Sequence, residues 1–551
     1  MTYRENINQY ITDALKDNWE NLALTDFDGA SFQYRDVARK IAKLHILFDS
    51  IGIKSGDKIA LCGKNSAQWA IAFFATVTYG AVAVPILHDF KPDNIHHLVS
   101  HSEARLLFTD AAVWENLDPD AISGLEGVLL ISDFSILLSR DSRLDSSRHN
   151  LNLLFGEKYP ERFTPDDISY FSPDADRLAI INYTSGSTGF SKGVMLTYGN
   201  LWSNLQFCID GLRFLDPGDG LVCMLPLAHM FGLMVELLHP FVKGCHISFL
   251  TRTPSPHVIM NAFERVKPKL IVTVPLIIEK IIRTRVFPML EKPMMKILLS
   301  LPIIDDKLLA KVKDKLTEVF GGNLQQIIIG GAGLNGDVEK FLRRIHFPFT
   351  VGYGMTECAP LIAYAPWQDQ RPGSCGRIVD RMSMRIDSPD PEHQPGVLWV
   401  KGGNVMQGYY KNPEATETAL KDGWLNTGDI CTVDNDGFLY IRGRDKNMIL
   451  GPSGQNIYPE EIEMQLNAMP YVGESLVIDR EGKLVALIYP DVENIKHQKL
   501  SEKEVMDIMQ QNISSLNSAL PAFSRISEFK IMTEEFEKTP KRSIKRYLYQ
   551  H

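Results

Sequence analysis

The chain has 551 residues, more than one ordinary domain holds, so we expect about two to four domains. A hydrophobic fraction of 44% and a charged fraction of 23% are typical of a globular protein. The formal net charge of −9 excludes a general nucleic-acid binder, because such a protein needs a basic excess to neutralise phosphates.

Helices and short apolar strands alternate along the chain. Buried strands are predicted at residues 58–62, 81–86, 177–182, 270–274, 326–329 and 347–351. Helical patterns are predicted at residues 34–51, 66–78, 305–319 and 336–345. Unbroken apolar strands between helices are typical of parallel sheets covered by helices, so we expect an α/β fold.

The chain changes character after Tyr440. The charged stretch 442–447 leads into a separate α/β pattern, and a short charged linker is a usual place for a domain boundary. We therefore predict two domains, residues 1–445 and residues 446–551.

Seven cysteines are scattered without paired spacing, at positions 62, 208, 223, 245, 358, 375 and 431. Free thiols in a reducing cytosol are the simplest interpretation, and no structural zinc site is expected. The polar segment 1–6 predicts no signal peptide, and no apolar run reaches the roughly eighteen residues of a spanning helix. We therefore expect a cytoplasmic protein.

Residues 281–299 interleave basic and apolar side chains, as interfacial segments do. Pro288 and Pro293 break any long helix there, which favours a loop-and-helix cover over the substrate domain. At most, this segment predicts peripheral contact with the inner face of a membrane.

The most informative stretch is residues 183–193, which read Tyr-Thr-Ser-Gly-Ser-Thr-Gly-Phe-Ser-Lys-Gly. Four hydroxyls come from Thr184, Ser185, Ser187 and Thr188. Lys192 adds a cation, and the backbone can approach an anion closely at Gly186, Gly189 and Gly193. A polyphosphate site is predicted, but not a Walker A loop, because Ser191 precedes the lysine and Gly193 follows it. A Ser/Gly-rich surface turn is the alternative.

A second turn follows the predicted strand 347–351 and reads Val-Gly-Tyr-Gly-Met-Thr-Glu-Cys-Ala-Pro over residues 351–360. Tyr353 suits stacking on a base, and Thr356 suits a phosphate contact. Glu357 suits Mg²⁺, which prefers hard oxygen ligands. The alternative is a purely structural turn at a strand end.

Residues 331–336 read Gly-Ala-Gly-Leu-Asn-Gly, a GxGxxG match between a predicted strand and a predicted helix. A dinucleotide site in a nicotinamide oxidoreductase is one interpretation. It requires an acidic residue about twenty positions later, and the nearest candidate is Glu357, which suits magnesium better than a ribose. The match alone is therefore weak.

Two further segments carry polar side chains at turns. Asp429 in 423–430 can accept both hydroxyls of a ribose, and Arg444 can donate to ribose or phosphate. His229 in 225–233 has apolar neighbours and can line an apolar pocket. The alternatives are an aspartate that caps its own backbone and a hydrogen-bonded core histidine.

The order of these motifs resembles the adenylate-forming acyl-CoA synthetase superfamily from about Tyr34 to Arg546. Residues 274–280 and 446–463 resemble its long-chain fatty-acid ligase branch, although Leu276 stands where that branch often has arginine. The resemblance implies a large N-terminal domain of stacked α/β subdomains, with mostly parallel sheets plus a β-subdomain. It also implies a small, mobile α+β C-terminal domain.

The resemblance also implies a reaction. A fatty acid of medium or long chain attacks the α-phosphate of ATP, pyrophosphate leaves with Mg²⁺, and coenzyme A then takes the acyl group from acyl-AMP. In such a reaction the protein mostly positions groups and screens charge.

Residue roles follow from the resemblance. Lys192 and the 184–189 loop would hold the β- and γ-phosphates, while Thr356 and Glu357 would position the α-phosphate and magnesium, with Thr184 as a second metal contact. Adenine would lie against Gly331, Ala332 and Gly333, with Tyr353 stacked on it and Gly354 and Met355 in the same turn. Asp429 and Arg444 would hold the ribose, and His229 would stand at the mouth of the acyl pocket. Lys446 would be the hinge about which the C-terminal domain turns, and Gly454 would face the thioester site.

One departure concerns the adenylation lysine. The family's C-terminal motif ends in Gly-Lys, and here Arg542 and Ser543 stand at those positions. Lys541, Lys545 or Arg542 can replace the missing lysine, since a flexible stem tolerates a short offset. Lys541 is the preferred candidate, and a basic solvated tail is the alternative.

Three other functions remain open at this point. The acyl group can pass to a carrier protein's phosphopantetheine in place of coenzyme A. The protein can be a catalytically impaired nucleotide- or acyl-binding homologue. The oxidoreductase suggested by GxGxxG is the third. No pattern in the chain sets the acyl chain length or the oligomeric state.

Overall fold

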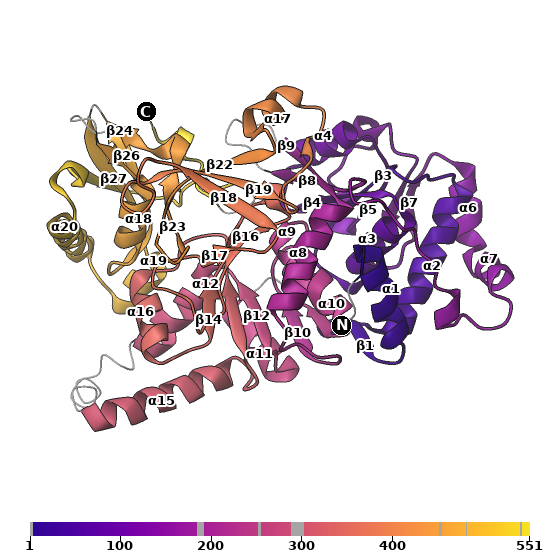
Figure 1. Ribbon diagram of the computed structural model, residues 1–551, viewed down its shortest axis with the longest axis horizontal. Helices are drawn as coiled ribbons and strands as arrows, with labels where there is room; N and C mark the ends of the chain where they lie inside the picture. Colours follow the sequence, from indigo (N-terminus) through magenta and orange to yellow (C-terminus); the bar gives the residue numbers. More distant parts are fainter. Residues whose placement is uncertain are drawn as a thin grey trace.

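The computed structural model describes residues 4–184, 192–251, 255–287, 302–450, 455–480, 482–539 and 543–550. The N-terminal elements gather at one end of an elongated molecule and the C-terminal elements at the other (Figure 1). Several small sheets lie between them.

The largest sheet has eight strands in the order β20-β9-β8-β4-β3-β5-β6-β7. Its parallel centre is β3 to β6 and β8, and its outer strands β7, β9 and β20 are antiparallel to their neighbours. The bounds are Lys58–Cys62 (β3), Val82–Ile86 (β4), Ala104–Thr109 (β5), Gly127–Leu130 (β6), Ile136–Ser139 (β7), Leu178–Thr184 (β8), Lys192–Thr197 (β9) and Gly408–Tyr409 (β20).

Helices cover both faces of this sheet, as its apolar strands require. Ile59 and Leu61 of β3 pack in one core with α2 (Tyr34–Ser50) and α3 (Ala67–Tyr79). Ala60 and Cys62 pack in another with α4 (Pro92–Ser102). α3 begins where the Ser66 hydroxyl accepts a hydrogen bond from Trp69 N, and it ends at Gly80, whose φ of 88° suits a residue without a Cβ.

Two further sheets complete the α/β part. One has the order β10-β11-β1-β2, with bounds Leu22–Asp26 (β1), Ser31–Gln33 (β2), Gly220–Cys223 (β10) and His246–Phe249 (β11). The other is parallel, with bounds Leu270–Thr273 (β12), Gln326–Ile329 (β13) and Phe349–Val351 (β14). Its neighbouring helices are α11 (Pro256–Val266), α12 (Pro275–Ile281), α15 (Pro302–Val319) and α16 (Gly336–Arg344). α1 (Ile7–Asp17), α8 (Tyr198–Gly211), α9 (Met230–Gly232) and α10 (His239–Val242) fill the space between layers.

An antiparallel β-subdomain follows. Its strands are β18 (Met382–Asp387), β19 (Gly396–Gly402), β21 (Leu420–Lys421), β22 (Trp424–Val433) and β23 (Leu439–Arg444). A smaller sheet of β15 (Tyr353–Gly354), β16 (Leu361–Tyr364) and β17 (Arg377–Ile378) connects it to the α/β part.

The C-terminal segment has its own core and an α+β pattern. Its strands are β24 (Ile449–Leu450), β25 (Asn456–Ile457), β26 (Val472–Arg480), β27 (Lys483–Pro490) and β28 (Glu528–Ile531). Its helices are α18 (Pro459–Asn467), α19 (Val492–Gln498) and α20 (Glu502–Ala519). A capping box in which Ser501 and Glu504 bond each other's backbone starts α20.

The predicted α/β class is confirmed, and most predicted elements lie within a few residues of the observed ones. Strand 347–351 begins later, at Phe349, because His346 has a φ of 49° and Pro348 cannot donate a ladder hydrogen bond. Strand 177–182 runs further, to Thr184. The boundary at 445/446 stays a prediction, and β23 passes directly into the short helical turn Asp445–Asn447.

All seven cysteines are buried free thiols. Among the described residues, no three His, Cys, Asp or Glu side chains form a metal-binding group. Within the same described ranges, no helix is long and apolar enough to cross a bilayer. Much of the predicted membrane-contact segment 281–299, including Pro288 and Pro293, lies outside the described residues.

Candidate active site

Asp429 and Arg444 form the core of the site in the middle of the molecule. β22 and β23 are antiparallel neighbours, and their register places the two residues directly opposite each other. Arg444 Nε lies 2.7 Å from Asp429 Oδ1, and the Tyr353 hydroxyl donates to Asp429 Oδ2 at 2.5 Å. The fold therefore brings together three predicted nucleotide-binding residues from three strands.

The Asp429 carboxylate is 3% exposed. Burial raises its pKa, and the Arg444 guanidinium acts in the opposite direction. Asp429 lies inside β22, and not after a turn as its sequence context suggests. Because Arg444 and Tyr353 already occupy one oxygen each, a ribose would share these oxygens with them, which a carboxylate's several lone pairs allow.

Tyr353 occupies β15, at the start of the predicted adenine-stacking turn. Its bond to Asp429 anchors the ring at its hydroxyl end. Burial first, then the negative charge of Asp429, raises the pKa of Tyr353, so its hydroxyl remains a donor. Gly354 and Met355 follow in the same turn.

Glu357 and Lys192 both contact Tyr409, a tyrosine that the sequence motifs did not include. Glu357 lies in the helical turn Thr356–Cys358, and its Oε1 accepts a 3.0 Å hydrogen bond from the Tyr409 hydroxyl. Lys192 Nζ lies 4.9 Å from the centroid of the Tyr409 ring. Lys192 begins β9, directly opposite Thr184 at the end of β8. Ser185, Gly186, Ser187, Thr188 and Gly189 lie outside the described residues.

The turn at Gly331, Ala332 and Gly333 joins β13 to α16. Gly331 has a φ of +87°, and a Cβ on Gly333 would lie 3.4 Å from Met464 Sδ of α18, so the C-terminal segment covers this turn. The Asn335 side chain already accepts the Asp337 and Val338 N–H groups at the start of α16. A dinucleotide pyrophosphate would need such helix N-terminal donors, so this GxGxxG lacks a feature of a dinucleotide site.

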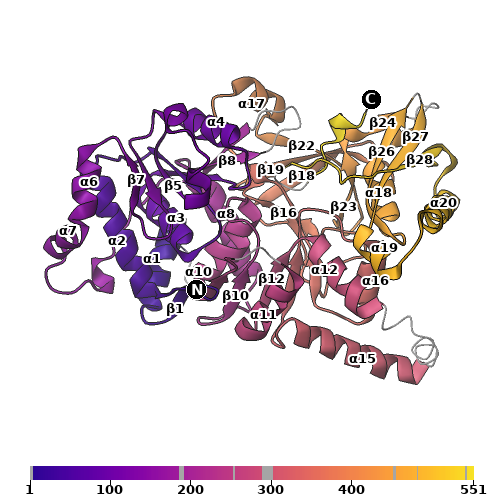
Figure 2. The same cartoon turned by 180° about the vertical axis from the view of Figure 1, so that it is seen from behind.

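Lys446 lies in the short turn between β23 and the C-terminal segment. Partial desolvation, then the neighbouring Arg444 cation, lowers its pKa, and Lys192 adds to this effect. Asn447 Nδ2 donates to Glu460 Oε1 at 2.5 Å, which ties this turn to α18. Both views show α18 beside β23 (Figure 2). Gly454 lies outside the described residues.

His229 precedes α9 in the segment between β10 and a π-helix, Leu233–Leu238. Two positions later, the Phe231 ring lies against Gly330, where a Cβ would be 3.0 Å from its edge carbons. The segment is held by Glu236, whose buried carboxylate accepts hydrogen bonds from Met224 N at 3.1 Å and Leu225 N at 2.8 Å. Burial raises the pKa of Glu236 to about 8. The Phe231 ring thus lies at Gly330, directly after the end of β13.

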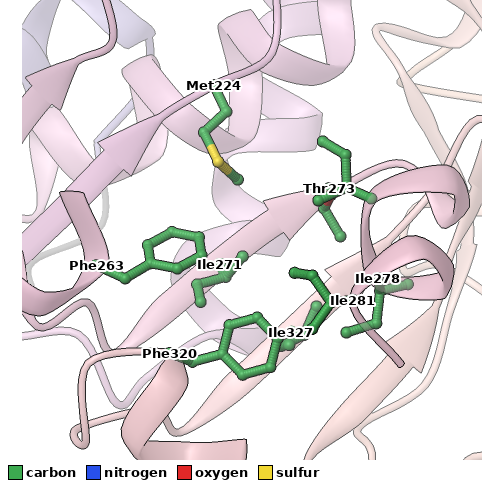
Figure 3. Close-up of a pocket in the computed structure, with 9 residues that line it drawn as sticks. Met224, Phe263, Ile271, Thr273, Ile278, Ile281, Phe320 and Ile327 are labelled. Carbon is green, nitrogen blue, oxygen red and sulfur yellow. The ribbon is translucent and has the colours of Figure 1, made fainter. Parts of the chain in front are cut away.

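An apolar cavity lies beside β12 and β13, on the side of α11 and α12 (Figure 3). Its volume is about 10 Å³, which is room for about one water molecule. The lining is Met224, Phe263, Ile271, Thr273, Ile277, Ile278, Ile281, Phe320 and Ile327. Met224 lines this cavity with its side chain and donates its backbone N–H to Glu236. It therefore lies both at the cavity and at the start of the segment that contains His229.

The C-terminal candidates for the adenylation lysine divide into two groups. Lys541 and Arg542 lie outside the described residues, so their roles stay predictions. Lys545 forms an ion pair with Glu537, which raises the pKa of Lys545. Arg546 likewise pairs with Glu463 at 2.8 Å. Lys545 is therefore engaged within the C-terminal segment.

The sequence motifs missed Tyr409 and Glu236. Tyr409 lies 52 residues from Glu357, and only the pairing of β20 with β9 brings it to Lys192. For Glu236 the sequence did carry a signal, because it is the acidic residue of the otherwise apolar run 233–238. A buried acidic side chain needs hydrogen-bond partners inside the protein.

Family profiles match two parts of the chain. Residues 12–410 match a profile described as AMP-binding enzyme, and residues 446–550 match one described as AMP-binding enzyme C-terminal domain. A long-chain-fatty-acid–CoA ligase (FadD15) of Mycobacterium bovis is 28% identical, over 93% of this chain and 89% of the relative. A 4-coumarate:CoA ligase of Petunia hybrida is 27% identical, over 88% of this chain and 83% of the relative.

Solved structures share the fold. ATP-bound MatB from Rhodopseudomonas palustris superposes with a TM-score of 0.76 at 23% identity, covering 99% of this chain and 98% of the other. The anthranilate CoA ligase AuaEII in complex with anthranoyl-AMP superposes with a TM-score of 0.78 at 20% identity, covering 100% of this chain and 97% of the other.

Proposed function

The chain belongs to the AMP-binding enzyme family of adenylate-forming acid–thiol ligases, and on that premise we propose that its acid substrate is a long-chain fatty acid. The protein then converts the acid to acyl-AMP with release of pyrophosphate and transfers the acyl group to coenzyme A. Relatives named long-chain-fatty-acid–CoA ligase from Mycobacterium bovis and Yersinia pestis support this assignment.

One observation carries the proposal for the nucleotide. Arg444 and Tyr353 both contact the Asp429 carboxylate, and Lys192 and Glu357 both contact Tyr409. An adenylating enzyme needs acceptors for a ribose and separate groups for a triphosphate. This arrangement supplies both from strands that are distant in sequence.

Each residue has a proposed task. Asp429 accepts the ribose hydroxyls, with Arg444 and Tyr353 holding its carboxylate, and Lys192 attracts the leaving pyrophosphate oxygens. Glu357 fits a magnesium site, because Tyr409 occupies Oε1 and a carboxylate keeps further acceptor capacity. Mg²⁺, when bound, would neutralise charge on the phosphate oxygens. Thr356 adds a hydroxyl beside Glu357.

The acid and acceptor sides rest on different residues. We propose that the carboxyl end of the acid lies near His229 and Phe231, and the Phe231 ring lies against Gly330 after β13. Lys446 is the proposed hinge about which the C-terminal segment turns, so that Gly454 and its neighbours face the thioester site in the second half-reaction. Lys541 is the proposed adenylation lysine, and peripheral membrane contact through 281–299 stays a proposal that liposome co-sedimentation tests.

A substrate panel tests the function. Purified protein is given ATP, Mg²⁺ and coenzyme A with acids from butanoate to stearate, together with coumarate and anthranilate, and free thiol is followed. We expect the highest kcat/KM with long-chain fatty acids. A preference for an aromatic acid would overturn the assignment. Turnover only with an acyl carrier protein would favour the carrier-protein alternative, and no pyrophosphate exchange with any acid would indicate an impaired homologue.

A further inference from the structure

We propose that Tyr409 is a positioning residue that holds Lys192 and Glu357 apart and oriented, so that one meets the triphosphate of ATP and the other its magnesium. This inference rests on the proposed function of the nucleotide site. Tyr409 itself need not touch the substrate, and its effect is on where two charged groups stand.

The backbone fixes Tyr409 to the strand that starts at Lys192. β20 pairs with β9 in antiparallel register, with Tyr409 opposite Val194 and Gly408 opposite Met195. The next residue, Tyr410, donates its N–H to Gly193 O at 2.7 Å. The Tyr409 N–H donates to Thr416 Oγ1 at 2.9 Å. The backbone of Tyr409 is therefore fixed to the strand that starts at Lys192.

The same short segment also holds Glu357. Met406 N donates to Glu357 O at 2.8 Å, and the Tyr409 hydroxyl donates to Glu357 Oε1 at 3.0 Å. Backbone and side chain of Glu357 are thus both fixed by residues 406–409. Tyr409 is 8% exposed, which strengthens its hydrogen bond to the carboxylate.

The Tyr409 side chain contacts two groups of opposite charge, one at its ring face and one at its hydroxyl. Its ring face attracts the Lys192 ammonium at 4.9 Å from the centroid, within the range of a cation–π contact. Its hydroxyl donates to the Glu357 carboxylate at the other end of the side chain.

The consequence is a pair of charges that do not neutralise each other. Among the residues that the structure describes, no carboxylate lies within 4.0 Å of the Lys192 ammonium. A direct Lys192–Glu357 ion pair would have to break before either group met phosphate or metal. A tyrosine that contacts each of them separately keeps both groups available, which is preorganisation.

The alternative is a core tyrosine with incidental contacts, and three variants distinguish the two. Tyr409→Phe keeps the ring and removes the bond to Glu357. Tyr409→Leu removes both contacts. Tyr410→Phe is the matched control, because Tyr410 directly follows β20 and its hydroxyl also donates to a carboxylate, Glu103 Oε2, at 2.8 Å.

The readout is the Kd of MgATP by calorimetry, with KM for fatty acid and coenzyme A alongside. We expect Tyr409→Phe to raise the Kd about tenfold, the loss typical of one hydrogen bond to a charged group, with the other two KM values unchanged. Tyr409→Leu should raise the Kd of MgATP further than Tyr409→Phe does. This additional rise should vanish when both variants are made in a Lys192→Met protein. Tyr410→Phe should bind MgATP like the parent.

A Tyr409→Phe protein that binds MgATP as tightly as Tyr410→Phe overturns the inference, even if Tyr409→Leu fails to fold. The proposed function fails separately, if the parent binds MgATP but activates no fatty acid while Tyr409→Phe still weakens binding. A parent protein that does not bind MgATP contradicts both.

Discussion

Arg444 and Asp429 face each other across two antiparallel strands, with Arg444 Nε 2.7 Å from Asp429 Oδ1. Asp429 is buried, whereas the Arg444 side chain is 47% exposed. The pair thus has a protected acceptor and an accessible donor. That asymmetry suits a site where the carboxylate must keep its position while the guanidinium meets a ligand from solvent.

Replacing Asp429 tests this pair directly. Asp429→Asn leaves the shape but weakens the contacts to Arg444 and Tyr353, so we expect the KM for MgATP to rise about tenfold. The free energy of unfolding should fall by about 1–3 kcal/mol, because buried polar groups lose their matched partners. Steady-state kinetics and urea unfolding measure the two effects. Asp387→Asn, exposed on β18 of the same sheet, is the control, and equal effects of both variants would refute the role of Asp429.

Lys192 is expected to act in only one half-reaction. Lys192→Met should slow pyrophosphate exchange by about 10²–10³-fold, the cost of removing one group that stabilises developing charge. Thioester formation from synthetic acyl-AMP and coenzyme A should keep its parent rate, because pyrophosphate has already left. Rapid-quench assays separate the steps. An equal loss in both would show that Lys192 supports the fold or coenzyme A binding and not the triphosphate.

The C-terminal lysines should differ in effect. Lys541→Ala should slow adenylation by about 10²–10³-fold. Lys545→Ala should change it little, because Glu537 already engages Lys545. Adding Ser543→Lys to Lys541→Ala should restore activity, since lysine then stands at the family position. Pyrophosphate exchange measures all three, and a slow Lys545→Ala with a normal Lys541→Ala would reverse the assignment.

Glu236 should make stability depend on pH. Its folded pKa of about 8 lies above the ordinary value of 4.5, so the folded state holds a proton that the unfolded state has lost between these values. The contribution of Glu236 to the free energy of unfolding is therefore complete at low pH. It declines by about 1.4 kcal/mol per pH unit as the pH rises toward 8. Glu236→Gln keeps an acceptor for Met224 and Leu225 without titrating. Measured by urea unfolding, the free energy of unfolding of the variant should rise relative to that of the parent from pH 5 to pH 8. A difference between the two proteins that stays constant with pH would contradict this.

Much of the fold was predictable from local pattern. The strands at 58–62 and 326–329 are apolar after their first residues, Lys58 and Gln326, and the observed bounds are identical to the predicted ones. Strand ends were less certain, because they depend on partners. β8 continues to Thr184 since β9 pairs with it as far as Lys192. The late start of β14 depends on the backbone at His346 and Pro348.

The site was predictable in its motifs and not in its connections. Asp429, Arg444 and Tyr353 each carried a turn or charge signal, but their mutual contacts arise from strand register. Tyr409 carried no signal of its own, because its role depends on pairing between β20 and β9. Glu236 stands in an apolar run, and its two backbone partners lie on the preceding segment.

The most direct test of the central claim is the fate of a carboxyl oxygen. A long-chain fatty acid labelled with oxygen-18 in its carboxyl group is incubated with the protein, ATP, Mg²⁺ and coenzyme A. The masses of the products are then measured by mass spectrometry. Attack of the carboxylate on the α-phosphate predicts one labelled oxygen in AMP and acyl-CoA as the other product. Unlabelled AMP, or label in pyrophosphate, would contradict the acyl-adenylate account.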